Sequence, residues 1–183
     1  MMNCWKTVNI NKEFGLNRLY LMSFLTGLLS FLLLYLPFSM FHGTHDMKDH
    51  GFLPLLVILF FLPSMHRLMH ILPLILFYKR LRVNFKFRKR VIPTFTYQCK
   101  SKLSKQTSIM MALAPTLFIT IPALIMACVF PKYYAYLILF ASVNIGISFS
   151  DYLYLNYFAR APRKCIIENA KEGYDILVQQ REA

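Results

Sequence analysis

Residues 52–77 read FLPLLVILFFLPSMHRLMHILPLILF, and Arg67 is the only side chain among them that stays ionised at every ordinary pH. A helix that crosses a hydrocarbon layer of about 30 Å needs roughly 20 mostly apolar residues. The stretch is long enough and apolar enough to meet that requirement. It therefore predicts a transmembrane helix, which we place at Phe52–Tyr78.

The same criterion selects three more segments, Leu19–Phe41, Ser108–Phe130 and Tyr133–Phe158. Hydrophobic residues make up 57% of the 183-residue chain and the mean hydropathy is +0.45, which is high for a soluble protein of this size. We predict a mostly α-helical membrane protein built as a four-helix transmembrane bundle. The expected divisions are an N-terminal arm (1–18), a four-span membrane domain (19–158) and a tail (159–183).

The basic residues predict how these spans are oriented. Eighteen Lys and Arg residues fall in the arm, in the loop 79–107 and in the tail, whereas only Lys48 and Lys132 fall on the alternate side. The positive-inside rule then places both termini and the loop in the cytoplasm. The net charge of +13 is thus explained as a topology signal, without a nucleic-acid partner. We expect the basic loop to attract anionic lipid headgroups, at ~1 kcal/mol per residue.

Two regions outside the spans alternate apolar and polar residues, as β-strands do. In the loop 79–107, the alternation over Arg82–Arg88 and Thr94–Cys99 predicts a small β-hairpin on the cytoplasmic membrane surface. Its open edge could receive an extended peptide. In the tail, two apolar runs flank Lys171-Glu172-Gly173 and favour a second hairpin, with a short helix as the alternative.

A few polar residues lie inside the predicted spans, where a charge costs roughly 2.5–3.5 kcal/mol. They are His66, Arg67, His70, Asn144 and Asp151. The two histidines are four residues apart and share one helix face, which is the spacing of the His-Glu-x-x-His zinc motif. Two imidazoles and one carboxylate make a reasonable zinc ligand set with an open fourth position. These three side chains can meet if the second and fourth spans are neighbours.

Five sequence elements in a fixed order carry a family resemblance. They are His66-x-x-x-His70, the strand pair Val83–Cys99, Ala112–Pro115, Ser148–Asp151 and Ala161–Lys164. In these elements the chain resembles the zincin peptidase family of small bacterial multi-pass membrane proteins, a domain family of unknown function with a site-2-protease-like layout. The resemblance implies a bacterial cell-membrane protein that binds zinc through His66, His70 and Asp151.

The chain departs from the active pattern at one position, because Arg67 stands where a Glu would act as general base. An arginine stays protonated and cannot serve as a base. Three arrangements remain open: an Arg67–Asp151 ion pair in a metal-free core, a metal site without hydrolysis, and an active enzyme with another base. The ion pair would account for both buried charges at once.

These arrangements lead to three functional hypotheses. We favour a catalytically degenerate metallopeptidase, not an enzyme, that binds a membrane-protein client or another membrane partner. The alternatives are an active zinc metallopeptidase with a non-standard base and a structural or lipid-associated four-span protein. A further histidine group between the first two spans, His42, His45 and His50 with Asp46 and Asp49, could bind a divalent ion. We expect that loop to be a solvated turn.

Overall fold

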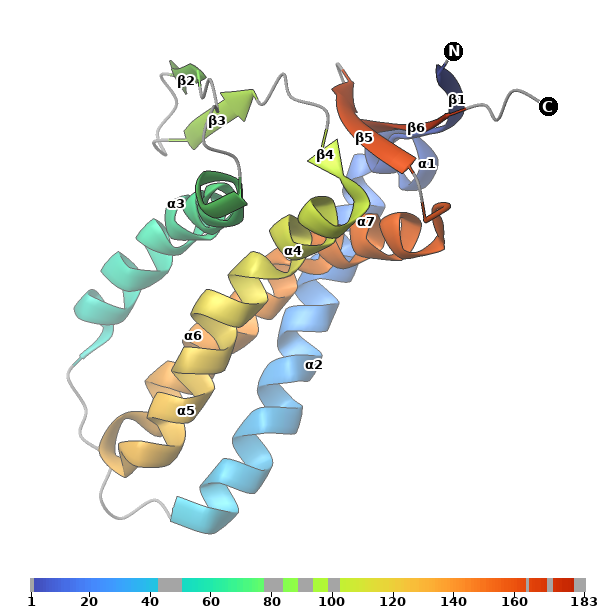
Figure 1. Cartoon of the computed structure of the whole chain (residues 1–183). Coiled ribbons are helices and arrows are strands. Elements are labelled where there is room, and N and C mark those ends of the chain that lie inside the picture. Colours follow the sequence, from blue (N-terminus) through green and yellow to red (C-terminus); the bar gives the residue numbers. More distant parts are fainter. Residues whose placement is uncertain are drawn as a thin grey trace.

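The computed structural model describes residues 2–42, 51–77, 84–88, 94–98, 103–163, 165–170 and 173–179. Long helices form most of this structure, and two small antiparallel sheets lie together at one end of them (Figure 1). The candidate site lies among the helices, and the larger sheet covers one end of the helical bundle. The histidines and acids of the loop 43–50 and the basic residues around the hairpin strands lie outside the described residues.

Three helical segments are long and apolar enough to cross a membrane, and they confirm the first three predicted spans. The first two are single helices and the third is interrupted. Their bounds are α2 (Leu16–His42), α3 (Phe52–Phe77), and α4 (Lys105–Pro115), η1 (Thr116–Thr120) and α5 (Ile121–Val129) in succession. The chain is thus a membrane protein with three such segments, or four when the bent pair that follows is counted as one.

The predicted fourth span is not a single straight helix. After a 3-10 turn, η2 (Pro131–Tyr133), it is built from α6 (Tyr134–Ile147) and α7 (Phe149–Arg160), which are bent by 50° at Ser148. The Ser148 hydroxyl donates to the Asn144 carbonyl oxygen at 2.9 Å, a back-bond that commonly bends helices. The bend carries the first turn of α7, and with it Asp151, toward α3.

The third span is interrupted beside the same bend. Pro115 has no backbone N–H, so the carbonyl of Met111, four residues earlier, lacks its helical donor. The chain continues as the π-helix η1, a form that often marks functional sites. The interruption therefore frees one backbone carbonyl in the interior of the helical bundle.

The larger sheet combines both ends of the chain. Its order is β1 (Met2–Val8), β6 (Gly173–Gln179), β5 (Cys165–Ala170) and β4 (Leu103–Ser104), with all pairs antiparallel. The β5–β6 pair confirms the hairpin expected in the tail. The N-terminal strand is not foreseen in the sequence, because its partner β6 lies at the other end of the chain. A short helix, α1 (Ile10–Phe14), joins β1 to α2.

The second sheet is the hairpin of β2 (Asn84–Arg88) and β3 (Thr94–Gln98), in the register Asn84↔Gln98 and Phe87↔Phe95. It confirms the predicted hairpin between the second and third spans. Both sheets lie at the same end of the helices (Figure 1).

The larger sheet packs on the end of α7 and the start of α2. Its buried cluster consists of Val8, Ile10, Leu19, Phe158, Ala161, Cys165, Ile167 and Ile176. In addition, the Lys105 ammonium donates to the Ala159 and Ala161 carbonyls at 2.9 and 2.6 Å. A cation at a helix C-terminus complements the helix dipole. The end of α7 is therefore fixed by both packing and charge.

The helices α2 and α6 cross at two glycines. A Cβ built on Gly146 would lie 2.8 Å from the Ser23 carbonyl oxygen and 3.1 Å from the Gly27 Cα. Glycine lets two membrane helices approach this closely. This contact fixes α6 against α2 two residues before the bend at Ser148.

We expect Gly146→Ala to destabilise the protein by about 1–3 kcal/mol, because the new methyl group meets backbone atoms that cannot move aside. Gly27→Ala should cost less, since its Cβ would lie 3.3 Å from the nearest atom, the Ser142 carbonyl oxygen. Thermal unfolding followed by circular dichroism in detergent measures both. Leu33→Ala, on the exposed face of α2, is the control. Equal melting temperatures for Gly146→Ala and the wild type would contradict the tight crossing.

Candidate metal centre

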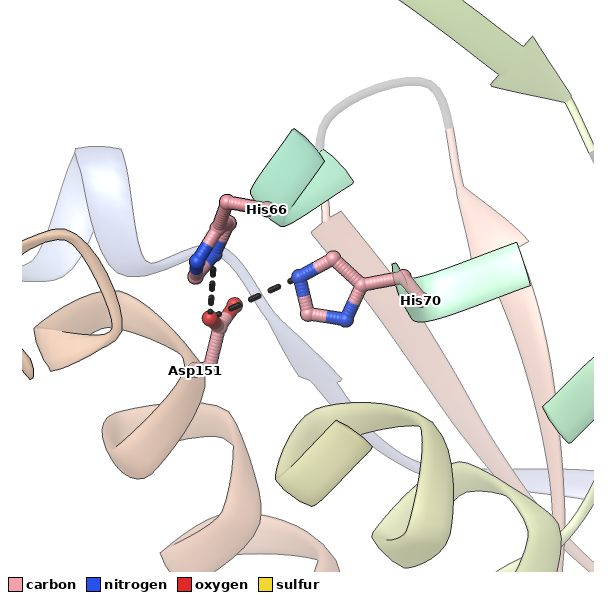
Figure 2. Close-up of side chains that lie close together, drawn as sticks. All are labelled: His66, His70 and Asp151. Carbon is pink, nitrogen blue, oxygen red and sulfur yellow. Dashed lines mark hydrogen bonds and ion pairs between the residues drawn. The ribbon is translucent and has the colours of Figure 1, made fainter. Parts of the chain in front are cut away.

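Three side chains from two helices converge inside the helical bundle (Figure 2). His66 and His70 lie on the same face of α3, because they are four residues apart, and Asp151 reaches them from the first turn of α7. The Asp151 Oδ2 atom lies 3.0 Å from His66 Nε2 and 3.5 Å from His70 Nε2. Both histidines are buried. The structure therefore brings together the three residues that the sequence singled out as metal ligands.

The protonation of both imidazoles follows from what their other nitrogens contact. His70 Nδ1 lies 2.7 Å from the Met111 carbonyl, which can only accept, so Nδ1 carries the proton. His66 Nδ1 lies 3.0 Å from Asn144 Oδ1, which is also an acceptor. The Asn144 amide is oriented by its Nδ2, which donates to the Pro115 carbonyl at 3.2 Å and the Thr120 hydroxyl at 2.9 Å. Whenever either ring is neutral, its lone pair is therefore on Nε2, the nitrogen that faces Asp151.

The site consequently gathers three electron-pair donors, two Nε2 atoms and one carboxylate oxygen. All three ligand atoms lie within 4.8 Å of one another. Donors this close repel one another unless a cation lies between them or the imidazoles take up protons. The three residues could therefore hold a metal ion.

The residues present fit zinc in chemistry and spacing. Nitrogen and carboxylate oxygen ligands bind zinc at about 2.0–2.2 Å, and a tetrahedron of that size has edges of ~3.3 Å. The 3.0 and 3.5 Å separations bracket that edge. Each imidazole also donates its other N–H to an oxygen acceptor, which is the usual support of a metal-bound histidine.

Further hydrogen bonds tie this support to the interrupted third span. Asn144 is fully buried and contacts both ends of the π-helical segment, through Pro115 and Thr120. Thr116 and Tyr152 share a hydrogen bond of 2.8 Å between their hydroxyls, next to Asp151 in sequence. Sequence reasoning noted Asn144 without a role and did not identify Met111. The signal for Met111 was Pro115, whose missing N–H frees that carbonyl.

The Arg67–Asp151 ion pair considered in the sequence analysis is wrong. Asp151 is paired with the two histidines, and within the described part of the chain Arg67 has no ion-pair partner. Arg67 is one residue on from His66, so it points about 100° around α3 from the ligand face. Its side chain is exposed and lines a groove beside the site.

This groove has a volume of 920 Å³ and lies between α2, α3, α6 and the start of α7. Its lining includes His66, Arg67, His70 and Asp151, together with mostly apolar side chains of α2 and α6. A smaller cavity of 60 Å³ is also lined by His70 and Asp151, together with Met111 and Tyr154. The three candidate ligands thus lie in the lining of this groove.

Comparison with known proteins identifies the family. A family model described as "Putative zincin peptidase" matches residues 58–166, more than half of the chain, and the chain belongs to that family. The match spans all three candidate ligands and confirms the resemblance drawn from the motifs. No curated protein and no solved structure matches the chain.

We expect Asn144→Leu to lower zinc affinity by about 10- to 100-fold, because the His66 Nδ1–H loses the acceptor that keeps the Nε2 lone pair in the site. Competition with a zinc chelator of known affinity, on folded detergent-solubilised protein, measures the effect.

Thr120→Val is the matched control. It removes one acceptor of the Asn144 amide but leaves the bond to His66, so its effect should be smaller. If Asn144→Leu bound zinc as tightly as the wild type, the assigned role of Asn144 would be wrong.

Proposed function

We propose that this member of the zincin peptidase family is a zinc-binding membrane protein that holds a membrane partner without hydrolysing it. The observation that carries the proposal is the position of Arg67, exposed in the groove next to His66, His70 and Asp151. In an active zincin, the metal polarises a water molecule and a neighbouring carboxylate accepts its proton. Arg67 occupies that neighbouring position and accepts no proton at ordinary pH.

The presence of His66, His70 and Asp151 together supports metal binding, and not a core held by an Arg67–Asp151 ion pair. Asp151 contacts the two histidines and not Arg67, so a metal ion that displaces the ring protons would meet all three ligand atoms. The residues around the ligands would hold the ion in the bilayer interior, where an unpaired Asp151 carboxylate would be costly. Metal binding would therefore leave the fold intact, and the groove would remain open to a partner.

An active enzyme with another base is the second candidate, and the 60 Å³ cavity beside His70 and Asp151 favours it. A cavity of this size holds several water molecules, each of which needs about 10–15 Å³. The two candidates differ in one measurable property, the cleavage of a membrane substrate.

Our proposal includes the orientation predicted from charge. Both sheets lie at one end of the helices, and their strands come from the arm, the loop 79–107 and the tail. The strong excess of Lys and Arg in these segments supports a cytoplasmic location for that end in a bacterial cell membrane. The basic loop would then contact anionic lipid headgroups.

We expect protein purified in mild detergent to contain about one zinc per chain, measured by mass spectrometry of the metal, because the site offers three zinc ligands. Asp151→Ala should lose the zinc, and Arg18→Ala, an exposed position outside the groove, should retain it. If the wild-type protein contained no zinc even after incubation with excess zinc, the proposed metal centre would be ruled out.

The same preparations separate binding from catalysis. The zinc-loaded wild type should leave a synthetic transmembrane peptide intact over hours, as judged by mass spectrometry, because no described side chain takes the place of the missing base. Arg67→Glu restores a carboxylate at that position and is the positive comparison. Chelator-sensitive fragments from the wild type, absent from Asp151→Ala, would overturn the non-hydrolytic proposal.

A further inference from the structure

The groove beside the candidate centre is shaped by helices that do not close over it. The helix α2 packs along α6, while α3 packs mainly on α4, so α2 and α3 flank the groove from opposite sides. Leu16, Tyr20, Phe24, Leu28 and Phe31 line it along α2. They recur at every third or fourth residue and so form an apolar face directed into the groove, about 22 Å long.

Arg67 is the cation of this groove, and it lies deep within its span. Ten residues separate Arg67 from the end of α3 at Phe77, roughly 15 Å along the helix, and the other end at Phe52 is farther. An arginine side chain cannot reach water over that distance by extending toward the membrane surface. Charges at such depth are retained in membrane proteins when they pair.

Among the described residues nothing pairs with Arg67. Asp151 is the acid of the groove, and its carboxylate is engaged by both histidines. The Arg67 guanidinium therefore remains available to a carboxylate from outside the chain, at the depth of the metal site.

Resting on the proposed function, we propose that the groove binds a transmembrane helix of a partner protein that carries an Asp or Glu near the middle of its span, and that this carboxylate pairs with Arg67. The apolar face of α2 and the walls of α6 would contact the partner's apolar side chains. The pairing would neutralise two charges at a depth where an unpaired charge is costly, which makes the contact selective for an acidic helix. Anionic lipids fit less well, because their headgroups lie at the membrane surface and not ~15 Å below it.

The test uses the full-length, zinc-loaded protein in phosphatidylcholine vesicles and a labelled synthetic peptide. The peptide is a Leu/Ala helix of about 20 residues with a single central Glu, and the comparison peptide has Gln there. Association is measured by fluorescence energy transfer. We expect the Glu peptide to bind about tenfold more tightly than the Gln peptide. Arg67→Met should abolish the difference and Arg67→Lys should keep it.

Arg18→Met is the matched control, since it removes an exposed arginine of α2 that lies outside the groove, and it should bind like the wild type. Equal binding of the two peptides, or a preference for Glu that survives Arg67→Met, would overturn the inference. A preference lost in Asp151→Ala but kept in Arg67→Met would also overturn it, by assigning the carboxylate to the metal. Zinc content measured on the same samples distinguishes these outcomes from failure of the proposed metal centre.

Discussion

Two oxygen acceptors, the Met111 carbonyl and the Asn144 side-chain amide, keep the ring protons of His70 and His66 on Nδ1. As a result, both Nε2 atoms face Asp151, and three possible metal ligands share a small, mostly buried volume. The rest of the bundle supplies these acceptors. Pro115 frees the Met111 carbonyl, the π-helical segment orients Asn144, and the bend at Ser148 brings the carboxylate to the histidines.

The position of Arg67 gives this site its particular chemistry. In a zincin the residue after the first histidine supplies a proton acceptor, and here it supplies a permanent positive charge. The charge faces the groove between α2 and α3 and does not contact the carboxylate of the ligand set. The same helix can therefore present ligands on one face and a cation for a partner on another. That division supports the proposed function, in which the protein binds zinc and holds a membrane partner without hydrolysing it.

The sequence predicts those features that depend on local periodicity. The spacing of His66 and His70, the long apolar runs and the alternation in both hairpins each reflect one helix face or one strand, and all are found in the structure. Features that depend on distant contacts are not predictable in this way. The apolar run 133–158 contains no sign that Ser148 bends it, and β1 pairs with a strand more than 160 residues away. The predicted Arg67–Asp151 ion pair is wrong because the prediction matched two opposite charges without considering the direction in which α3 presents each side chain.

The central claim is that His66, His70 and Asp151 hold zinc through two Nε2 atoms and a carboxylate oxygen. Zinc-edge X-ray absorption on the purified, zinc-loaded protein tests it most directly. We predict a first shell of nitrogen and oxygen atoms at about 2.0–2.2 Å, with the outer-shell pattern of two imidazoles, and loss of that pattern in His66→Ala/His70→Ala. A first shell with sulfur at about 2.3 Å, or a spectrum without imidazole scattering, would contradict the account.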